Sequence, residues 1–208
     1  MRYEIKYAVP HLESQAIEAY LMAHPASFAR AYADRQVNNI YLDTPEFKCF
    51  HENVEGHPQR KKLRLRWYGT SYMPTTPSVL EEKVKVQELG YKNSYKITNT
   101  IRSSADLLDA TSQVGILQAE LRPVLHNTYL RSYYLSQDGL FRVTIDRQQS
   151  FAMPFAHGRP LAVVPYPVII ELKYEAEHSP RASDIMDYLP YRQTKNSKYA
   201  NGVEELYF

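Results

Sequence analysis

Apolar and charged residues alternate along eight short runs of this chain, and this alternation constrains the fold more than any other feature. The runs lie at 2–7, 38–43, 61–68, 79–86, 93–98, 127–135, 140–147 and 167–174. Alternation with a period of two is typical of β-strands, and few Gly or Pro residues interrupt these runs. Tyrosine, which favours half-buried strands, occurs 18 times. We therefore expect a fold dominated by β-structure.

Helical patterns are fewer. Apolar residues recur at helical spacing in 11–22, a serine cap and an early aspartate begin 104–110, and a short helix is expected at 181–189. The segments 69–78 and 154–167 are rich in Pro, Gly, Ser and Thr, which indicates loops. No internal repeat or linker divides the chain, so we expect one domain over residues 1–208.

Composition excludes several classes of protein. Hydrophobic residues make up 44% and charged residues 23% of the 208 residues, which excludes a disordered chain. A single cysteine, Cys49, excludes a disulfide scaffold and a cysteine-based zinc site, and it suggests a reducing compartment. The first ten residues lack the apolar core of a signal peptide, and no run is long and apolar enough to span a membrane. We expect a cytoplasmic protein without direct membrane insertion.

The charged residues of the runs gather on one face of each expected strand. In 61–68, Lys62, Arg64 and Arg66 share one face, and apolar side chains occupy the other. The same division in other runs selects Glu4, Lys6, Glu81, Lys83, Lys85, Arg131, Arg142, Glu171 and Lys173. An amphipathic antiparallel sheet with its charged face in water would explain this pattern.

Two features favour a different arrangement. Nearly every run contributes Arg or Lys, and several place a Glu one alternation away. Eight strands also suffice to close a barrel whose interior accommodates side chains or one small ligand. We therefore expect an α+β fold, an eight-stranded antiparallel β-barrel with a few flanking helices, in which the charged faces point inward.

A tunnel lined with cations requires a ligand of opposite charge, because like charges in a confined, partly desolvated space repel strongly. A polyanion with closely spaced negative groups would relieve that repulsion. Guanidinium groups bind phosphate oxygens bidentately, and lysines add point charges. The few inward carboxylates suit Mg²⁺ or Mn²⁺, which prefer oxygen ligands. This combination is typical of phosphoryl transfer.

The motifs resemble a known family. In order, they are RYEIKY, NIYLDTPEF, KLRLRWYG, LEEKVK, YLRSYY, FRVTID, IIELKY and KNSKYANGV, from residue 2 to residue 203. Together they resemble the VTC domain, the catalytic domain of the vacuolar transporter chaperone polyphosphate polymerase, within the triphosphate tunnel metalloenzyme (CYTH-like) superfamily. The resemblance implies an eight-stranded tunnel that binds triphosphate with a divalent metal. It also implies transfer of the terminal phosphate of ATP onto polyphosphate.

The resemblance assigns roles to individual residues. Lys6 matches the lysine of a shortened E-x-E-x-K signature in which Arg2 replaces the earlier glutamate. Glu171 matches the metal-binding glutamate, with Glu4 or Glu81 as further candidate ligands of Mn²⁺ or Mg²⁺. The residues expected to act in catalysis are Lys6, Arg64, Arg66, Lys83, Arg142, Lys195 and Lys198. The expected phosphate-binding residues are the same seven together with Lys62, Lys85 and Arg131.

Several of these roles have structural alternatives. The spacing of Lys195 and Lys198 predicts one helical face that could gate a tunnel mouth, or else a solvated pair on a terminal helix. Glu171 could form a salt bridge to an inward cation, and Arg142 could pair with Asp146. A second pair, Tyr41 and Asp43, shares a face and is expected to hydrogen-bond the tunnel arginines.

Three functions remain open on the sequence. The first two are a polyphosphate polymerase, in which a phosphate chain accepts the transferred group, and a triphosphatase, in which water accepts it. The abbreviated N-terminal signature removes one candidate metal ligand and so argues against strong catalysis by either enzyme. A non-catalytic binder of polyphosphate, inositol phosphate or nucleic acid is the third. Net charge of only +2 argues against nucleic acid. The expected partners are ATP or triphosphate and polyphosphate, with a separate membrane protein as a further possible partner, because the chain lacks the transmembrane helices of VTC polymerases.

Overall fold

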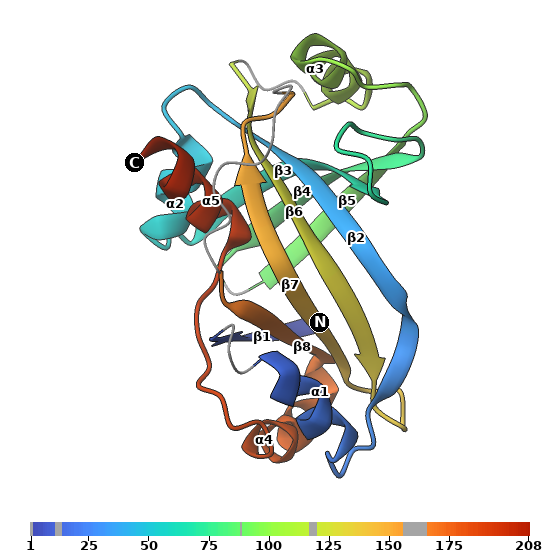
Figure 1. Cartoon of the computed structure of the whole chain (residues 1–208). Helices are drawn as coiled ribbons and strands as arrows, with labels where there is room; N and C mark the ends of the chain where they lie inside the picture. Colours follow the sequence, from blue (N-terminus) through green and yellow to red (C-terminus); the bar gives the residue numbers. More distant parts are fainter. Residues whose placement is uncertain (1, 11–13, 88, 117–119, 156–165) are drawn as a thin grey trace. The chain divides into compact units, whose positions relative to one another are not determined.

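The computed structural model describes residues 2–10, 14–87, 89–116, 120–155 and 166–208. Its strands are β1 (Arg2–Val9), β2 (Ala29–Asp43), β3 (Gln59–Tyr68), β4 (Ser78–Val86), β5 (Leu89–Ile97), β6 (Arg122–Leu135), β7 (Arg142–Ala152) and β8 (Val168–Glu175). Its helices are α1 (Ser14–Met22), α2 (Lys48–Val54), α3 (Ser104–Gln113), α4 (Ser179–Asp187) and α5 (Lys198–Tyr207), with a 3₁₀ turn at Ala176–His178 (Figure 1).

The eight strands form one antiparallel sheet in the order β1-β8-β7-β6-β2-β3-β4-β5. All eight expected strands are therefore confirmed, and β2 begins nine residues before the expected run at 38–43. The strand order ends at β1 and β5. Within the described residues these two edges are not hydrogen-bonded neighbours, so the sheet is not a closed ring of strands.

Helix prediction was correct for three ranges and missed one helix, while a terminal helix was expected around Lys195 and Lys198 without bounds. Helix α3 begins after Ser103, whose side chain accepts from the Asp106 N–H while the Asp106 carboxylate accepts from the Ser103 N–H, a complete capping box. Elements α1 and α4 fall within two to three residues of the expected ranges. The missed helix is α2, whereas α5 agrees with the expected terminal helix near Lys198. The expected loop at 69–78 is confirmed up to Pro77, whereas most of the one at 154–167 lies outside the described residues.

Contacts along the chain define two compact units. Unit 1 comprises Met1–Arg35, Tyr129–Gln149 and Val163–Asn196, and unit 2 comprises Gln36–Thr128, Ser150–Ala162 and Ser197–Phe208. The boundaries fall inside β2, β6 and β7, so these three strands contribute residues to both units. The expectation of one domain over residues 1–208 stays a prediction.

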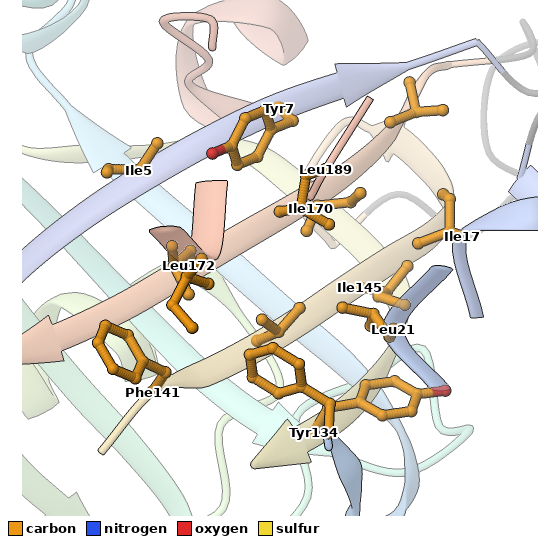
Figure 2. Packing of buried hydrophobic residues seen from close by; sticks show 14 of the residues in the cluster. Ile5, Tyr7, Ile17, Leu21, Tyr134, Phe141, Ile145, Ile170, Leu172 and Leu189 are labelled. Carbon is orange, nitrogen blue, oxygen red and sulfur yellow. The ribbon is translucent and has the colours of Figure 1, made fainter. Parts of the chain in front are cut away.

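Unit 1 has its own apolar core beneath β1, β8 and β7. Figure 2 shows this cluster, in which Ile5 and Tyr7 of β1 and Ile170 and Leu172 of β8 come from the faces opposite their charged neighbours. Helices α1 and α4 supply apolar residues to the same cluster. Since successive strand residues point to opposite faces, this core leaves the alternate, charged residues on the other side of the sheet.

Unit 2 has a second core built around Trp67, Leu65 and Leu80 and covered by α3. Helix α5 packs closely against this unit at Gly202. A β-carbon at that position would lie 2.6 Å from the Phe151 ring and 2.7 Å from a Leu125 methyl group. The glycine of the KNSKYANGV motif is therefore required for the close approach of α5 to its neighbours.

Candidate functional site

Strands β3, β4 and β5 of unit 2 place a concentration of cations on one face. The register aligns Lys62 with Lys83 and Lys83 with Lys92, and the neighbouring rows follow the same alternation. We define the cation face as Arg60, Lys62, Arg64, Arg66, Lys83, Lys85, Lys92 and Lys96. The rows formed by β3, β4 and β5 on this face contain one carboxylate, Glu81, which lies opposite Arg64. Eight formal positive charges therefore meet one negative charge.

The two arginines at the centre of this face are partly removed from solvent. The side chain of Arg66 is 12% exposed and that of Arg64 is 24% exposed. Arg66 donates from Nε to Asn39 Oδ1 at 2.9 Å, and Arg64 donates from Nη1 to the Tyr41 hydroxyl at 3.1 Å. The expected contact between Tyr41 and a central arginine is thus confirmed. Both guanidinium groups are oriented by neighbours on β2.

The carboxylate of Glu81 holds the centre of the face together. Its Oε2 accepts from Arg64 Nε at 2.8 Å and lies 3.6 Å from Arg66 Nη1, while its Oε1 lies 2.6 Å from Lys92 Nζ. Burial alone would raise the pKa of Glu81, but the charges of Arg64 and Arg66 and the hydrogen bond from Lys92 lower it to about 2. Glu81 is therefore ionised at neutral pH and offsets part of the cation repulsion.

The start of helix α5 lies next to Lys62 of the cation face. The Lys62 ammonium donates to Ser197 Oγ at 2.9 Å and to Asn53 Oδ1 at 3.0 Å. The Tyr199 ring contacts the Tyr41 ring in a tilted arrangement, with centroids 5.0 Å apart, and the Tyr199 hydroxyl bonds to the Asp43 carboxylate. These contacts fix the N-terminus of α5 next to the lysine.

The expectation that Asp43 bonds a tunnel arginine is wrong. Its carboxylate accepts from the backbone N–H groups of Thr44, Cys49 and Phe50 at 2.8, 2.8 and 3.0 Å, so it caps the start of α2. Together with the Tyr199 hydroxyl, these donors engage both carboxylate oxygens. Asp43 therefore has a structural role, joining β2 to α2 and α5.

A second charged group lies in unit 1, on β1 and β8. The register places Lys6 opposite Glu171 and Glu4 opposite Lys173. Lys6 Nζ lies 3.1 Å from Glu4 and 3.8 Å from Glu171, and Lys173 Nζ lies 2.7 Å from Glu171 and 3.8 Å from Glu4. The two lysines and two glutamates thus form an alternating square of charge. The predicted salt-bridge alternative for Glu171 is confirmed.

Arg131 links this square to β7. Its guanidinium binds Asp146 through Nε and Nη2 at 2.5 and 2.6 Å, and Nη2 also lies 3.2 Å from Glu171. Burial of Arg131 disfavours its charge, but Asp146 and Glu171 hold its pKa well above the ordinary value. Arg131 is therefore a permanent cation that positions Glu171.

Arg142 begins β7 opposite Lys173 of β8 and is exposed. These two cations line a shallow hollow with Tyr174 and His178. Beside them, Thr144 lies opposite Glu171 and is buried, and its hydroxyl has no hydrogen-bond partner within the described residues. The expected alternative partner of Arg142, Asp146, binds Arg131.

A family model for the VTC domain matches residues 1–207. The chain belongs to the VTC domain family. No curated protein sequence matches it significantly.

Solved structures resemble this VTC domain at low sequence identity. A protein of Vibrio parahaemolyticus described as a candidate adenylate cyclase has a TM-score of 0.55 and 15% identity, and the alignment covers 94% of each chain. A Bacillus halodurans protein with the same description has a TM-score of 0.59 and 13% identity over 100% of this chain and 98% of that one.

A third similar chain comes from the Mediator head module of Schizosaccharomyces pombe, with a TM-score of 0.51 and 10% identity over 99% of this chain and 90% of that one. At such identities these likenesses show the fold alone, and function must be argued from the site.

The VTC domain places its predicted site residues in two groups. One group lies on the cation face of unit 2 and comprises Lys62, Arg64, Arg66, Lys83 and Lys85, with Glu81 among them. Lys198 belongs to the same unit but lies on α5. The residues Lys6, Arg131, Arg142, Glu4 and Glu171 belong to unit 1, as does Lys195. Convergence of both groups on one ligand stays a prediction.

Lys195 and Lys198 do not share a helical face, contrary to the prediction. Helix α5 begins at Lys198, and Ser197 caps it by accepting from the Ala200 N–H at 3.2 Å. Lys195 therefore precedes the helix and is exposed, whereas Lys198 is buried in its first turn. Serine has a strong preference for the cap position, and this explains why the helix starts between the two lysines.

Sequence reasoning missed three cations of the VTC domain, Arg60, Lys92 and Lys96. Arg60 lies one residue before the expected strand at 61–68, and Lys92 lies one residue before the expected strand at 93–98. Lys96 lies within the run at 93–98, but the residues of that run were not divided between the two faces of a strand. Applying the alternation to 92–96 would have placed both lysines on one face, with Ser94 between them.

No group of three or more His, Cys, Asp or Glu within the described ranges is arranged to hold a metal ion. The predicted ligands Glu4 and Glu171 lie on the neighbouring strands β1 and β8, and each pairs with Lys6 and Lys173. Two carboxylates supply oxygen donors that suit Mg²⁺ or Mn²⁺, but the remaining ligands would have to come from a bound phosphate. The third candidate, Glu81, is surrounded by cations and does not fit a metal-binding role.

Within the described residues, no helix is long and apolar enough to span a membrane.

Proposed function

We propose that this VTC domain binds chains of linked phosphates and transfers the terminal phosphate of ATP onto such a chain. The observation that carries the proposal is the cation face, where the described rows of three adjacent strands hold eight cations and one carboxylate, Glu81. Membership of the VTC domain family supports it.

The dimensions of the cation face favour a polyanion over a single phosphate. From Arg60 to Arg66 the β3 strand rises by roughly 20 Å, and three strands span roughly 10 Å across. A row such as Lys62, Lys83 and Lys92 repeats at the spacing between strands, so each lysine repels the next. Several linked phosphate groups would neutralise such rows together, whereas one orthophosphate would reach only two or three cations.

Phosphoryl transfer requires positioning and charge neutralisation more than a reactive side chain. In the proposed reaction, an oxygen of the polyphosphate terminus forms a bond to the γ-phosphorus of ATP, the bond from that phosphorus to the bridging oxygen breaks, and ADP leaves with that oxygen. Arg64 and Arg66 are proposed to hold phosphate oxygens bidentately, with Lys83 adding charge. Lys6 and Arg142 are proposed to act in the same way in unit 1.

A divalent ion would contribute charge neutralisation at the transferred group when it is bound. We propose Glu171 and Glu4 as its protein ligands. Lys6 and Lys173 each pair with both glutamates. A phosphate that attracts these ammonium groups would free carboxylate oxygens, so metal and phosphate would assist each other in binding.

The test is incubation of the protein with ATP and Mn²⁺ or Mg²⁺, followed by electrophoresis of polyphosphate and quantification of ADP and free phosphate. Long chains with stoichiometric ADP support the polymerase. Free phosphate without chains would identify a triphosphatase, and the absence of turnover despite tight triphosphate binding would identify a non-catalytic binder. Each of the last two outcomes contradicts the proposed transfer.

Two variants on β3 make the test specific to the cation face. Arg66→Ala removes a central cation, whereas Lys61→Ala removes one from the opposite face, where Lys61 is exposed and pairs with Glu82. Arg66→Ala is expected to lower triphosphate affinity at least tenfold without unfolding the protein, and Lys61→Ala is expected to leave it unchanged. Equal effects of both variants would contradict the assignment of the face.

A further inference from the structure

An arginine and two tyrosines form an exposed aromatic corner in unit 1. The Arg35 guanidinium carbon lies 5.4 Å from the Tyr32 ring centroid and 5.6 Å from that of Tyr133. The two rings contact each other edge to face, with centroids 5.7 Å apart at 86°. Tyr32 is 59% exposed, so one large aromatic surface faces solvent beside a cation. Such a pair of features is typical of sites that stack a planar group.

The register connects this corner to the charged square of unit 1. The Ser136 N–H donates to the Phe141 carbonyl across the β6–β7 turn. Continuing the antiparallel register from that pair places Tyr133 opposite Thr144 and Arg131 opposite Asp146. The ion pair between Arg131 and Asp146 agrees with this register. Thr144 lies opposite Glu171, and Glu171 lies opposite Lys6.

One row of the sheet therefore runs from Lys6 on β1 through Glu171 and Thr144 to Tyr133 on β6. Three strand spacings separate its ends, a distance of roughly 14 Å. The row begins at the Lys6 ammonium group and ends at the Tyr133 ring. Between them lie the Glu171 carboxylate and the buried Thr144 hydroxyl, which has no hydrogen-bond partner in the described part of the chain. The two ends of the row, a cation and an aromatic ring, suit the two ends of a nucleoside triphosphate, its terminal phosphate and its base.

We propose that the aromatic corner of Tyr32, Tyr133 and Arg35 binds the base of a nucleoside triphosphate whose phosphates bind Lys6, Lys173 and Arg142. This inference rests on the proposed function and specifies its donor as a nucleotide held at both ends. Thr144 lies between the two ends in the same row. Stacking accepts any base, so the corner favours nucleotides over inorganic triphosphate without selecting one base strongly.

The test compares the affinities of ATP and inorganic triphosphate, measured by calorimetry on the full chain. Tyr32→Ala is expected to weaken ATP binding roughly tenfold, as expected for loss of one stacking contact, and to leave inorganic triphosphate binding unchanged. Tyr32→Phe retains the ring and is expected to bind ATP as the unaltered protein does. Tyr91→Ala, which removes another exposed tyrosine from β5 of unit 2, is the matched control and is expected to have no effect.

The outcomes separate this inference from the proposed function. If inorganic triphosphate binds and Tyr32→Ala leaves ATP affinity unchanged, the base site is refuted while phosphate binding stands. If neither ligand binds, both are refuted. If Tyr32→Ala weakens binding of a single-stranded oligoadenylate but not of ATP, the corner is a nucleic-acid surface and the inference is overturned. Melting curves of each variant verify that Tyr32→Ala remains folded.

Discussion

Replacing Glu81 with glutamine tests the electrostatic balance of the cation face, because it removes one charge and little volume. The charges around Glu81 shift its pKa from the ordinary 4.5 to about 2. With 1.36 kcal/mol per pKa unit, ionised Glu81 stabilises the folded state by about 3 kcal/mol. For a protein of this size, such a loss corresponds to a fall in melting temperature of roughly 6–12 °C.

The sign of the pH dependence follows from the lowered pKa. Because the unfolded chain takes up a proton at Glu81 near pH 4.5 and the folded protein near pH 2, the stabilisation is complete above about pH 5. It is lost progressively as the pH falls toward 2. Urea titrations of the unaltered protein and of Glu81→Gln should therefore differ most at pH 7, and the difference should close in acid.

The same substitution is expected to strengthen binding of triphosphate, since the glutamate that repels phosphate is gone while Arg64, Arg66 and Lys92 remain. Glu82→Gln on the opposite face, where Glu82 pairs with Lys61, provides the control. A stability difference that persists at low pH would refute the electrostatic reasoning. Weaker triphosphate binding by Glu81→Gln would instead indicate that Glu81 acts directly on the ligand or a metal.

Three further substitutions probe the scaffold. Burial lowers the pKa of His126 to about 4, so the folded state loses stability as the pH falls from 6.5 toward 4; His126→Phe should abolish that loss in pH-dependent urea titrations. Gly202→Ala should lower the melting temperature, by overpacking against Phe151 and Leu125 that costs about 1–3 kcal/mol. Asp43→Ala should expose α2 and α5 to hydrogen exchange; unchanged protection would contradict its capping role.

The sequence pattern predicted the strands because alternation depends only on which side of a sheet is apolar. The same alternation identified Lys62, Arg64 and Arg66 as one face, opposite the core of unit 2. It failed at the first half of β2, where residues on both faces are half-buried or exposed and the apolar signal is absent. The short helix α2 was missed because its cap, Asp43, lies five residues before its first residue.

Ion pairing could not be read from the sequence. Glu81, Glu171 and Asp146 were recognised as charged residues, but the choice among several nearby cations depends on register and rotamer. Arg131 bonds to two carboxylates, and its expected role as a phosphate ligand stays a prediction. Carboxylates that compensate buried cations and carboxylates that hold a metal have the same sequence signature, so the distinction required distances.

Binding of linked phosphates by the face of β3, β4 and β5 is the property on which the proposed function depends. Its most direct measurement is the affinity of the protein for orthophosphate, inorganic triphosphate and longer linear polyphosphates, each determined at several salt concentrations. We predict affinity that rises steeply with chain length and falls with added salt, because successive phosphates engage successive rows of cations. Equally weak binding at every chain length, in the unaltered protein and in Arg66→Ala alike, would contradict the claim.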